Sequence, residues 1–326
     1  MNITSHLYYR SLLDEHDQAV YDALVEGWRK MEDSFSLPLS HIPFNKIISA
    51  VKEDIPAFFY VNYWKAGSCW EYPHKIQVEG GYLYTRQEAK ALLKDVEKWG
   101  SRVLTMMPEG LDDTTKALWL RDIILLNCKY GDSENPEAHS IIGVIKNKTA
   151  VCEGIAAAYK YLCDLGKIPC ITVTGKLDHS GHSWNLIWIN GEPAFVDATQ
   201  DITAHGAGER AGFIRNEEQM PLYEWDHSII PKTRLKNTTN PFIRVHSREE
   251  LFDQALKNSH CSTTTFYLDE SWDLKAGEMN DLCGLLYLKL RKTGKIELLI
   301  GEKSRSIFLK RNVRQKSNPN KREIRN

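Results

Sequence analysis

The spacing of apolar residues in the middle of the chain predicts a helix followed by a set of β-strands. Between Thr149 and Leu165, large apolar side chains recur at steps of three and four residues, which is the pattern of a half-buried helix. Thr149 is a suitable N-cap residue, and Gly166 is a suitable residue to end the helix. This helix would carry Cys152 in its first turn.

The residues after this helix are rich in β-branched side chains and predict three strands. Residues 168–174 form one such run, and a second begins at His182. Asn190-Gly191 is a strong signal for a two-residue hairpin turn, and the return strand ends on Asp197. Adjacent antiparallel strands would therefore bring His182 and Asp197 side by side.

The same patterns predict further elements on both sides of this region. Before it we expect helices over 14–32, over 44–51, from the capping box Thr85–Glu88 onward and over 118–127, strands over 57–64 and 74–84, and a polar loop over 131–139. After it we expect an extended irregular segment to residue 240, strands over 242–245 and 263–268, a helix capped by Ser247, and a hairpin of 285–290 with 296–300 around 292–294.

These elements suggest four segments. Residues 1–110 would form an N-terminal extension of helices and strands, and 111–240 a core with a trailing loop. Residues 241–310 would form a small α/β unit. Residues 311–326 carry six Lys and Arg against one Glu and few aliphatic residues, which predicts a disordered basic tail.

Composition narrows the class of protein. The chain has 326 residues, 42% of them hydrophobic, and a formal net charge of −1. It can therefore bury a sizeable core, and its charge balance gives no reason to expect binding to nucleic acid or to an anionic membrane. We find no apolar signal core at the N-terminus and no run long enough to span a bilayer.

The cysteine count bears on the compartment. Seven cysteines are scattered along the chain, an odd number without paired spacing. Together with the lack of a signal segment, this favours a reducing cytoplasm. A secreted effector without a cleavable signal is the alternative.

Cys152, His182 and Asp197 together form a candidate catalytic set. A helix start favours a thiolate, an imidazole can take the thiol proton, and a carboxylate can orient that imidazole. Each residue alone has an ordinary structural explanation, such as core packing for the cysteine or a turn for the aspartate. His179 and Asp201 are the alternates for the second and third roles.

A metal site is a weaker interpretation of the same region. Cys163, Cys170, His179 and His182 cluster in the sequence, but they lack the paired Cys-x-x-Cys spacing of zinc sites. There is also no EF-hand-like loop for calcium. We therefore expect neither a required metal nor a cofactor.

The segment from about 117 to 201 resembles the transglutaminase-like superfamily, in a bacterial-type form. The resemblance lies in four stretches: Leu-Arg-Asp-Ile-Ile-Leu-Leu-Asn-Cys-Lys-Tyr, Ala-Val-Cys-Glu-Gly-Ile-Ala-Ala-Ala-Tyr, Gly-His-Ser-Trp-Asn-Leu-Ile and Phe-Val-Asp-Ala-Thr. A looser match lies further upstream, in Glu-Asp-Ile-Pro-Ala-Phe-Phe-Tyr-Val. It implies an α+β fold: a papain-like transglutaminase core, with a cysteine-bearing helix packed on an antiparallel sheet. A mainly helical N-terminal extension and a small C-terminal α/β unit would flank this core.

The resemblance also implies roles for the three residues. Cys152 would be the nucleophile, His182 the general base and acid, and Asp197 the residue that orients it. The family includes cross-linking transferases, deamidases, peptidases and members without catalysis. We therefore expect a thiol-dependent acyl-transfer enzyme that acts on amide groups of a protein or peptide substrate through a thioester. A non-catalytic binding or scaffold protein on the same fold is the alternative.

Overall fold

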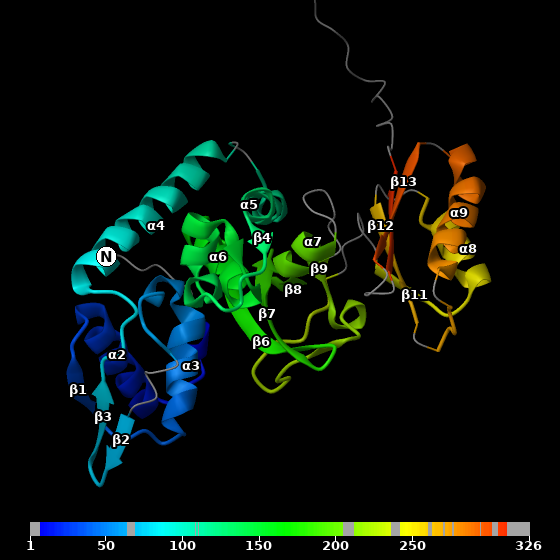
Figure 1. The fold of residues 1–326 in the computed structure, drawn as a ribbon. Coiled ribbons are helices and arrows are strands. Elements are labelled where there is room, and N and C mark those ends of the chain that lie inside the picture. The colour runs from blue at the N-terminus through cyan, green and yellow to red at the C-terminus, as the bar shows by residue number, and fades with distance from the viewer. Residues whose placement is uncertain are drawn as a thin grey trace, which may run out of the picture. The chain divides into compact units, whose positions relative to one another are not determined.

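A computed structural model gives the fold of the chain (Figure 1). It describes residues 7–63, 69–107, 109, 111–204, 212–235, 242–259, 263–269, 271–275, 277–293, 295–301 and 306–311. The chain divides into two compact units, Met1–Leu235 and Lys236–Asn326. The predicted basic tail after residue 311 lies outside the described residues. No helix in the described part of the chain is long and apolar enough to cross a membrane.

The first part of unit 1 is mainly helical. It contains α1 (Tyr8–Ser11), α2 (Glu15–Lys30), α3 (Phe44–Asp54), the 3₁₀ turn η1 (Pro56–Phe58) and α4 (Arg86–Met106), with a small antiparallel sheet of β1 (Ser34–Leu37), β3 (Lys75–Glu79) and β2 (Cys69–Tyr72). Asp14 caps α2, and the capping box of Thr85 and Glu88 starts α4 as expected. These elements belong to the same compact unit as the predicted core.

The predicted strands over 57–64 and 74–84 were only partly right. Pro56 opens η1, and residues 57–61 are all buried, so the side chains do not alternate as they would on a two-sided strand. Their aromatic rings pack edge to face with each other, as Phe58 and Tyr60 do. The second segment forms β3, which ends before Gly80, and Val61 and Tyr82 form an isolated bridge. Trp64 lies outside the described residues.

The rest of unit 1 packs helices against one antiparallel sheet. Its elements are α5 (Asp113–Asn127), β4 (Lys129–Tyr130), η2 (Pro136–His139), η3 (Gly143–Asn147), β5 (Thr149–Ala150), α6 (Cys152–Leu165), β6 (Cys170–Leu177), β7 (Ser180–Ile189), β8 (Glu192–Val196), α7 (Ala198–Ala204), β9 (Phe213–Arg215), η4 (Glu217–Gln219) and β10 (Tyr223–Glu224). The five strands follow the order β10-β6-β7-β8-β9, and every neighbouring pair is antiparallel. The expected α+β arrangement is confirmed.

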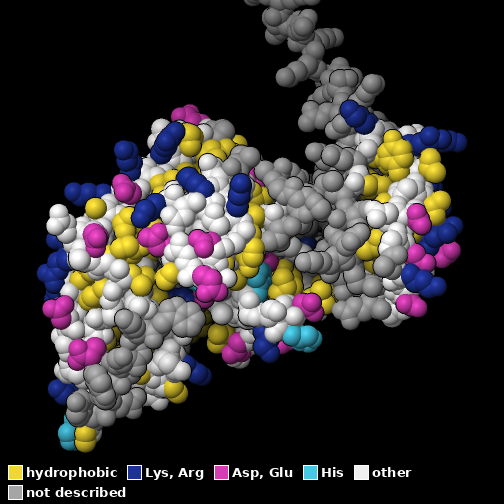
Figure 2. Space-filling model, viewed as in Figure 1, with side chains coloured by type: hydrophobic (Ala, Val, Ile, Leu, Met, Phe, Trp, Pro, Cys, Tyr) yellow, Lys and Arg dark blue, Asp and Glu magenta, His cyan; other side chains and the backbone are white. Residues whose placement is uncertain are grey.

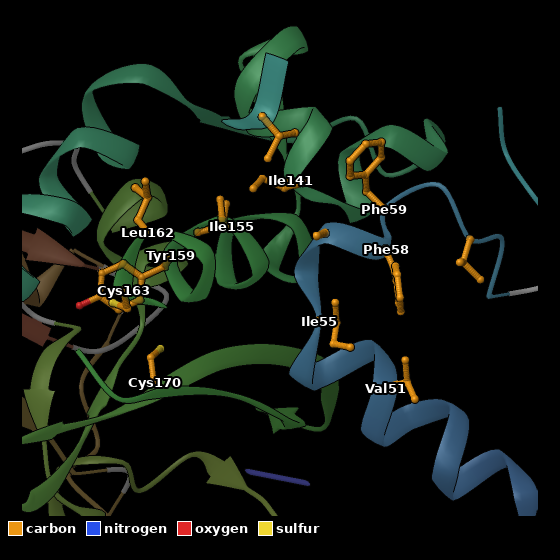
Figure 3. Packing of buried hydrophobic residues seen from close by; sticks show 14 of the residues in the cluster. Val51, Ile55, Phe58, Phe59, Ile141, Ile155, Tyr159, Leu162, Cys163 and Cys170 are labelled. Atoms are coloured by element: carbon orange, nitrogen blue, oxygen red, sulfur yellow. The ribbon is translucent and has the colours of Figure 1, made fainter. Parts of the chain in front are cut away.

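Helix α6 is the central helix of this unit. Its buried side includes Ile155, Tyr159, Leu162 and Cys163, and these side chains form one core with Ile55 and Phe58 from the α3–η1 segment (Figure 3). The helix begins later than expected. Thr149 does not cap it, because Thr149 and Ala150 pair with β4, and Val151 is the N-cap residue. Cys152 is therefore the first residue of the helix.

The segment after Asp197 is more ordered than its sequence suggested. Short strands β9 and β10 extend the sheet at its two edges, although we expected an irregular segment up to residue 240. Strands of two or three residues are too short for an alternating pattern to show. Residues 205–211 and 236–241 lie outside the described part.

Unit 2 has its own sheet and its own core. It contains β11 (Phe242–Val245), α8 (Arg248–Lys257), β12 (Thr263–Leu268), α9 (Glu278–Leu290), η5 (Arg291–Thr293), β13 (Ile296–Gly301) and β14 (Ser306–Arg311), with the strand order β11-β12-β14-β13. Ser247 caps α8 as expected. The predicted strand over 285–290 was wrong, because these residues end helix α9. β13 pairs with β14 and not with a strand before it, so the expected hairpin around 292–294 was also wrong.

Candidate active site

Cys152 stands at the N-terminus of α6 with its side chain partly exposed. Cys128, Cys163, Cys170 and Cys283 are buried. Burial raises the pKa of Cys163 well above its ordinary value, and it raises the pKa of Cys128 and of Cys283 to about 11. Among these thiols, Cys152 alone combines exposure with a helix start, the environment of reactive cysteines.

The turn η2 holds the start of α6 in place. The N–H of Val151 donates to the carbonyl oxygen of Ala138 at 3.0 Å. A side chain at Gly154 would lie 2.4 Å from that oxygen, so only glycine permits this approach of the two backbones. The close packing of η2 on α6 thus explains why the third residue of Cys-Glu-Gly, Gly154, is a glycine.

Asn185 connects the same helix to the sheet. Its side-chain Nδ2 donates to the carbonyl oxygen of Ala156 in α6 at 3.1 Å and to that of Ile171 in β6 at 3.3 Å. Asn185 is buried in the middle of β7, three residues after His182. Asn185 therefore ties α6 to the strand that carries His182.

His182 lies near the beginning of β7, and Asp197 follows β8 directly. The Asn190-Gly191 turn joins the two strands, and both turn residues have positive φ angles as the sequence predicted. His182 Nε2 is 2.8 Å from Asp197 Oδ2. Cys152, the first residue of α6, lies close enough to His182 to contribute to the raised pKa of this imidazole. Because Nε2 faces the carboxylate, Nδ1 is the ring nitrogen left for the thiol. The structure thus brings all three predicted residues together.

Asp197 has two structural roles, one for each carboxylate oxygen. Its Oδ1 accepts a hydrogen bond from the N–H of Gln200 at 3.0 Å, which makes Asp197 the cap of α7. Its Oδ2 faces His182 and also accepts a hydrogen bond from the hydroxyl of Tyr223 at 2.6 Å. The ordinary interpretation of Asp197 as a cap residue and the catalytic one are therefore compatible.

Tyr223 is a site residue that the sequence did not indicate. It lies on β10, is buried, and contacts both Asp197 and Gln200. Its ring packs edge to face on Trp184, which in turn stacks beside His182 at 5.7 Å between ring centroids. No local signal marks it, since it is separated from Asp197 by 26 positions and enters the site through a two-residue strand.

The charges of His182 and Asp197 stabilise each other. Burial alone would lower the pKa of His182, but Asp197 and Cys152 raise it to about 10. Burial alone would raise the pKa of Asp197, but the charge of His182 and the hydrogen bonds from His182, Tyr223 and Gln200 hold it below its usual range. The charged form of His182 is therefore favoured at neutral pH.

The two alternate residues are engaged elsewhere. The side chain of His179 is 89% exposed and lies 3.6 Å from Glu224. Asp201 is fully buried in an ion pair with Arg121 of α5, with 2.5 Å between Nη2 and Oδ2. Asp201 also accepts a hydrogen bond from Gly212, whose carbonyl oxygen accepts one from the N–H of Asp197. It therefore supports the loop that holds Asp197.

The structure does not assemble the zinc set considered from sequence. His179 is on the surface, while Cys163 in α6 and Cys170 in β6 are buried. Within the described residues, the one group with metal-ligand geometry is Asp14, Asp17 and His41. Asp14 caps α2 and hydrogen-bonds to His41, and Asp17 accepts a hydrogen bond from the backbone of His41. These contacts already account for the cluster.

Comparisons with known proteins give distant structural likenesses. No protein-family model matches the chain, and no curated protein matches it. Among solved structures, a TGase has 13% identity and a TM-score of 0.32 over 42% of this chain and 44% of that one. A proposed cysteine protease from Cytophaga hutchinsonii has 15% identity and a TM-score of 0.30 over 45% and 64%. A proposed protease from Parabacteroides distasonis has 11% identity and a TM-score of 0.28 over 74% and 54%.

In each case the chain spans less than two thirds of the neighbour's length. A helix opens on Cys152, packs on an antiparallel sheet, and is followed by a hairpin that carries His182 and Asp197. The core therefore has an α+β architecture in which one helix packs on one antiparallel sheet. Its reactive groups are a partly exposed thiol, an imidazole near it, and a buried carboxylate hydrogen-bonded to that imidazole.

Proposed function

We propose that this protein is a thiol-dependent acyl-transfer enzyme that acts on amide groups of a protein or peptide. The observation that supports it best is that His182 is hydrogen-bonded to Asp197 and lies near Cys152, the one partly exposed thiol at a helix start among the described cysteines. A buried carboxylate that holds an imidazole against a thiol is the geometry of an activated nucleophile.

The first half of the reaction would form a thioester. The Cys152 thiolate attacks the carbonyl carbon of an amide, and the bond between carbon and nitrogen then breaks. His182, charged at neutral pH, donates its proton to the departing nitrogen, so that ammonia or an amine leaves. The first turn of α6 offers backbone N–H groups without helical partners, which can stabilise the oxygen that becomes negatively charged.

The second half would release the acyl group. Neutral His182 takes a proton from water or from an amine, and this nucleophile attacks the thioester. The carbon–sulfur bond breaks and the thiolate returns. Water gives a carboxylic acid, by deamidation or peptide cleavage, and an amine gives a new amide. Access of the two acceptors to the thioester decides between these outcomes.

Mass spectrometry with a tagged amine tests the proposal. Candidate proteins are incubated with enzyme and tagged amine, and the mass change identifies deamidation, cleavage or amine incorporation. We expect one of these products from wild type and none from Cys152→Ala, while Cys283→Ala in unit 2 stays active. In parallel, iodoacetamide near neutral pH should modify Cys152 faster than Cys163 or Cys170. Equal rates for all three thiols, with no product from any substrate, would favour the scaffold alternative.

A further inference from the structure

A cavity of about 510 Å³ adjoins the candidate active site. On one side it is lined by α3 and η1, with Ile48, Ile55, Phe58 and Phe59, and on the other by α6, with Ala157. Figure 3 shows the end of α3 and the following turn beside α6, and it labels Ile55, Phe58 and Phe59 on this segment. A cavity of this size is within the range of small-ligand pockets and holds a large side chain with adjoining backbone.

The wall of the cavity contains the chain neighbours of two candidate catalytic residues. Its wall includes Glu153, the residue after Cys152, and Ser183, the residue after His182. Lys52, also on the wall, has its Nζ 3.0 Å from Glu153 Oε1. Lys52 is also close enough to Cys152 for this thiol to help raise the pKa of Lys52, so the wall of the cavity lies near the candidate nucleophile.

The charged residues of the wall are already paired with each other. Glu153 lies between Lys52 and His139, with 2.6 Å between its Oε2 and His139 Nδ1. Glu53 accepts a hydrogen bond from the Thr174 hydroxyl at 2.8 Å. Beside uncharged polar residues such as Asn45 and Ser140, the wall offers a ligand an apolar surface that includes the rings of Phe58, Phe59 and Tyr63.

We propose that this cavity binds a large apolar side chain, aromatic or branched aliphatic, that lies next to the reacting amide in the substrate. The inference rests on the proposed function, because it takes Cys152 as the acylated residue. It deepens that function by giving the substrate a sequence preference. It also gives the N-terminal elements a role, since α3 and η1 supply most of the apolar wall.

The test uses peptide chloromethyl ketones, which alkylate an active thiol without requiring turnover. The panel carries Phe, Leu, Ala or Asp at each of the three positions before the ketone, and each rate of Cys152 modification is divided by the same variant's rate with iodoacetamide. At one position we expect Phe or Leu to react about tenfold faster than Ala or Asp, because fitting a large apolar side chain is worth about 1–3 kcal/mol.

Two variants should abolish that preference. Ala157→Leu fills the cavity from α6, and Ser49→Leu narrows it from an exposed position of α3 that a folded protein tolerates easily. The matched control Ala91→Leu makes the same change on the exposed side of α4 and should leave the preference intact. A wild type that prefers no large apolar residue, or a preference that persists in both variants, would overturn the inference. Slow modification of wild-type Cys152 by iodoacetamide itself would instead overturn the proposed function, and this inference with it.

Discussion

Tyr223 connects a distant part of the chain to the candidate catalytic set. Its hydroxyl and His182 Nε2 share the same oxygen of Asp197, at 2.6 and 2.8 Å. Burial and the neighbouring Asp197 raise the pKa of Tyr223 well above its ordinary value, so it remains a hydrogen-bond donor throughout the working range of pH. The tyrosine thus fixes the carboxylate that fixes the imidazole.

Tyr223→Phe should therefore slow the reaction of Cys152 without unfolding the protein. Loss of a hydrogen bond to a charged group costs about 1.5–3 kcal/mol. If the whole cost is added to the activation free energy of the Cys152 reaction, the rate falls by about ten- to hundredfold. The measurement is the rate of iodoacetamide modification of Cys152 against pH. Tyr161→Phe, on the far part of α6, is the control and should match wild type. If the rate is unchanged in Tyr223→Phe, the hydroxyl does not position Asp197 for the reaction and Tyr223 serves only in packing.

His182 makes the free energy of unfolding depend on pH in the alkaline range. Its pKa is raised from an ordinary value of 6.5 to about 10. Between these two pH values, the folded protein therefore keeps a proton on His182 that the unfolded chain has released. The stabilisation is complete below pH 6.5 and is lost as the pH rises toward 10. We expect the free energy of unfolding to fall over this window by a few kcal/mol in wild type, and to change less in His182→Gln. Urea unfolding at several pH values measures both, and parallel profiles for the two proteins would contradict the assignment.

At the scale of elements, the packing of η2 against α6 depends on Gly154. A methyl group there would lie 2.4 Å from the oxygen of Ala138 and 2.7 Å from that of Ser140, and both are backbone atoms that cannot turn away. Gly154→Ala should cost about 1–3 kcal/mol, as overpacked sites do, despite the better helix propensity of alanine.

The matched control is Gly181→Ala in β7, where an added methyl group would meet nothing within 4 Å. Urea unfolding followed by tryptophan fluorescence is a suitable measurement, because Trp272 is the only tryptophan after residue 235 and the signal reports unit 1. Equal stability of the two variants would show that η2 shifts freely and does not anchor the helix.

Local sequence signals predicted the elements that carry Cys152, His182 and Asp197. The apolar spacing of α6 and the Asn190-Gly191 turn are both short-range patterns, and both are present in the structure. Elements whose form depends on distant partners were missed. In the apolar run 285–290, apolar and polar residues do not alternate in a way that distinguishes a strand from a helix. The run is helical, and its side chains Leu285, Tyr287 and Leu288 are exposed. Tyr223 reaches the site through sheet pairing with β6, which no local pattern encodes.

At the scale of the whole molecule, each unit buries a core of its own. Cys163 and Cys170 belong to the core of unit 1, and Cys283 belongs to that of unit 2. On the face shown in Figure 2, both signs of charge are interspersed over the described residues, in keeping with a formal net charge of −1. The chain thus offers buried thiols that report separately on its two cores.

Separate cores predict separate unfolding transitions. Labelling of thiols at increasing urea, read by mass spectrometry, should give one midpoint for Cys163 and Cys170 and another for Cys283, because each thiol becomes reactive only when its own core opens. Gly154→Ala should lower the first midpoint and leave the second unchanged, since the substitution lies in unit 1. If all three thiols shift together in that variant, the two units unfold as one cooperative structure, and the stability of the candidate site depends on the whole chain.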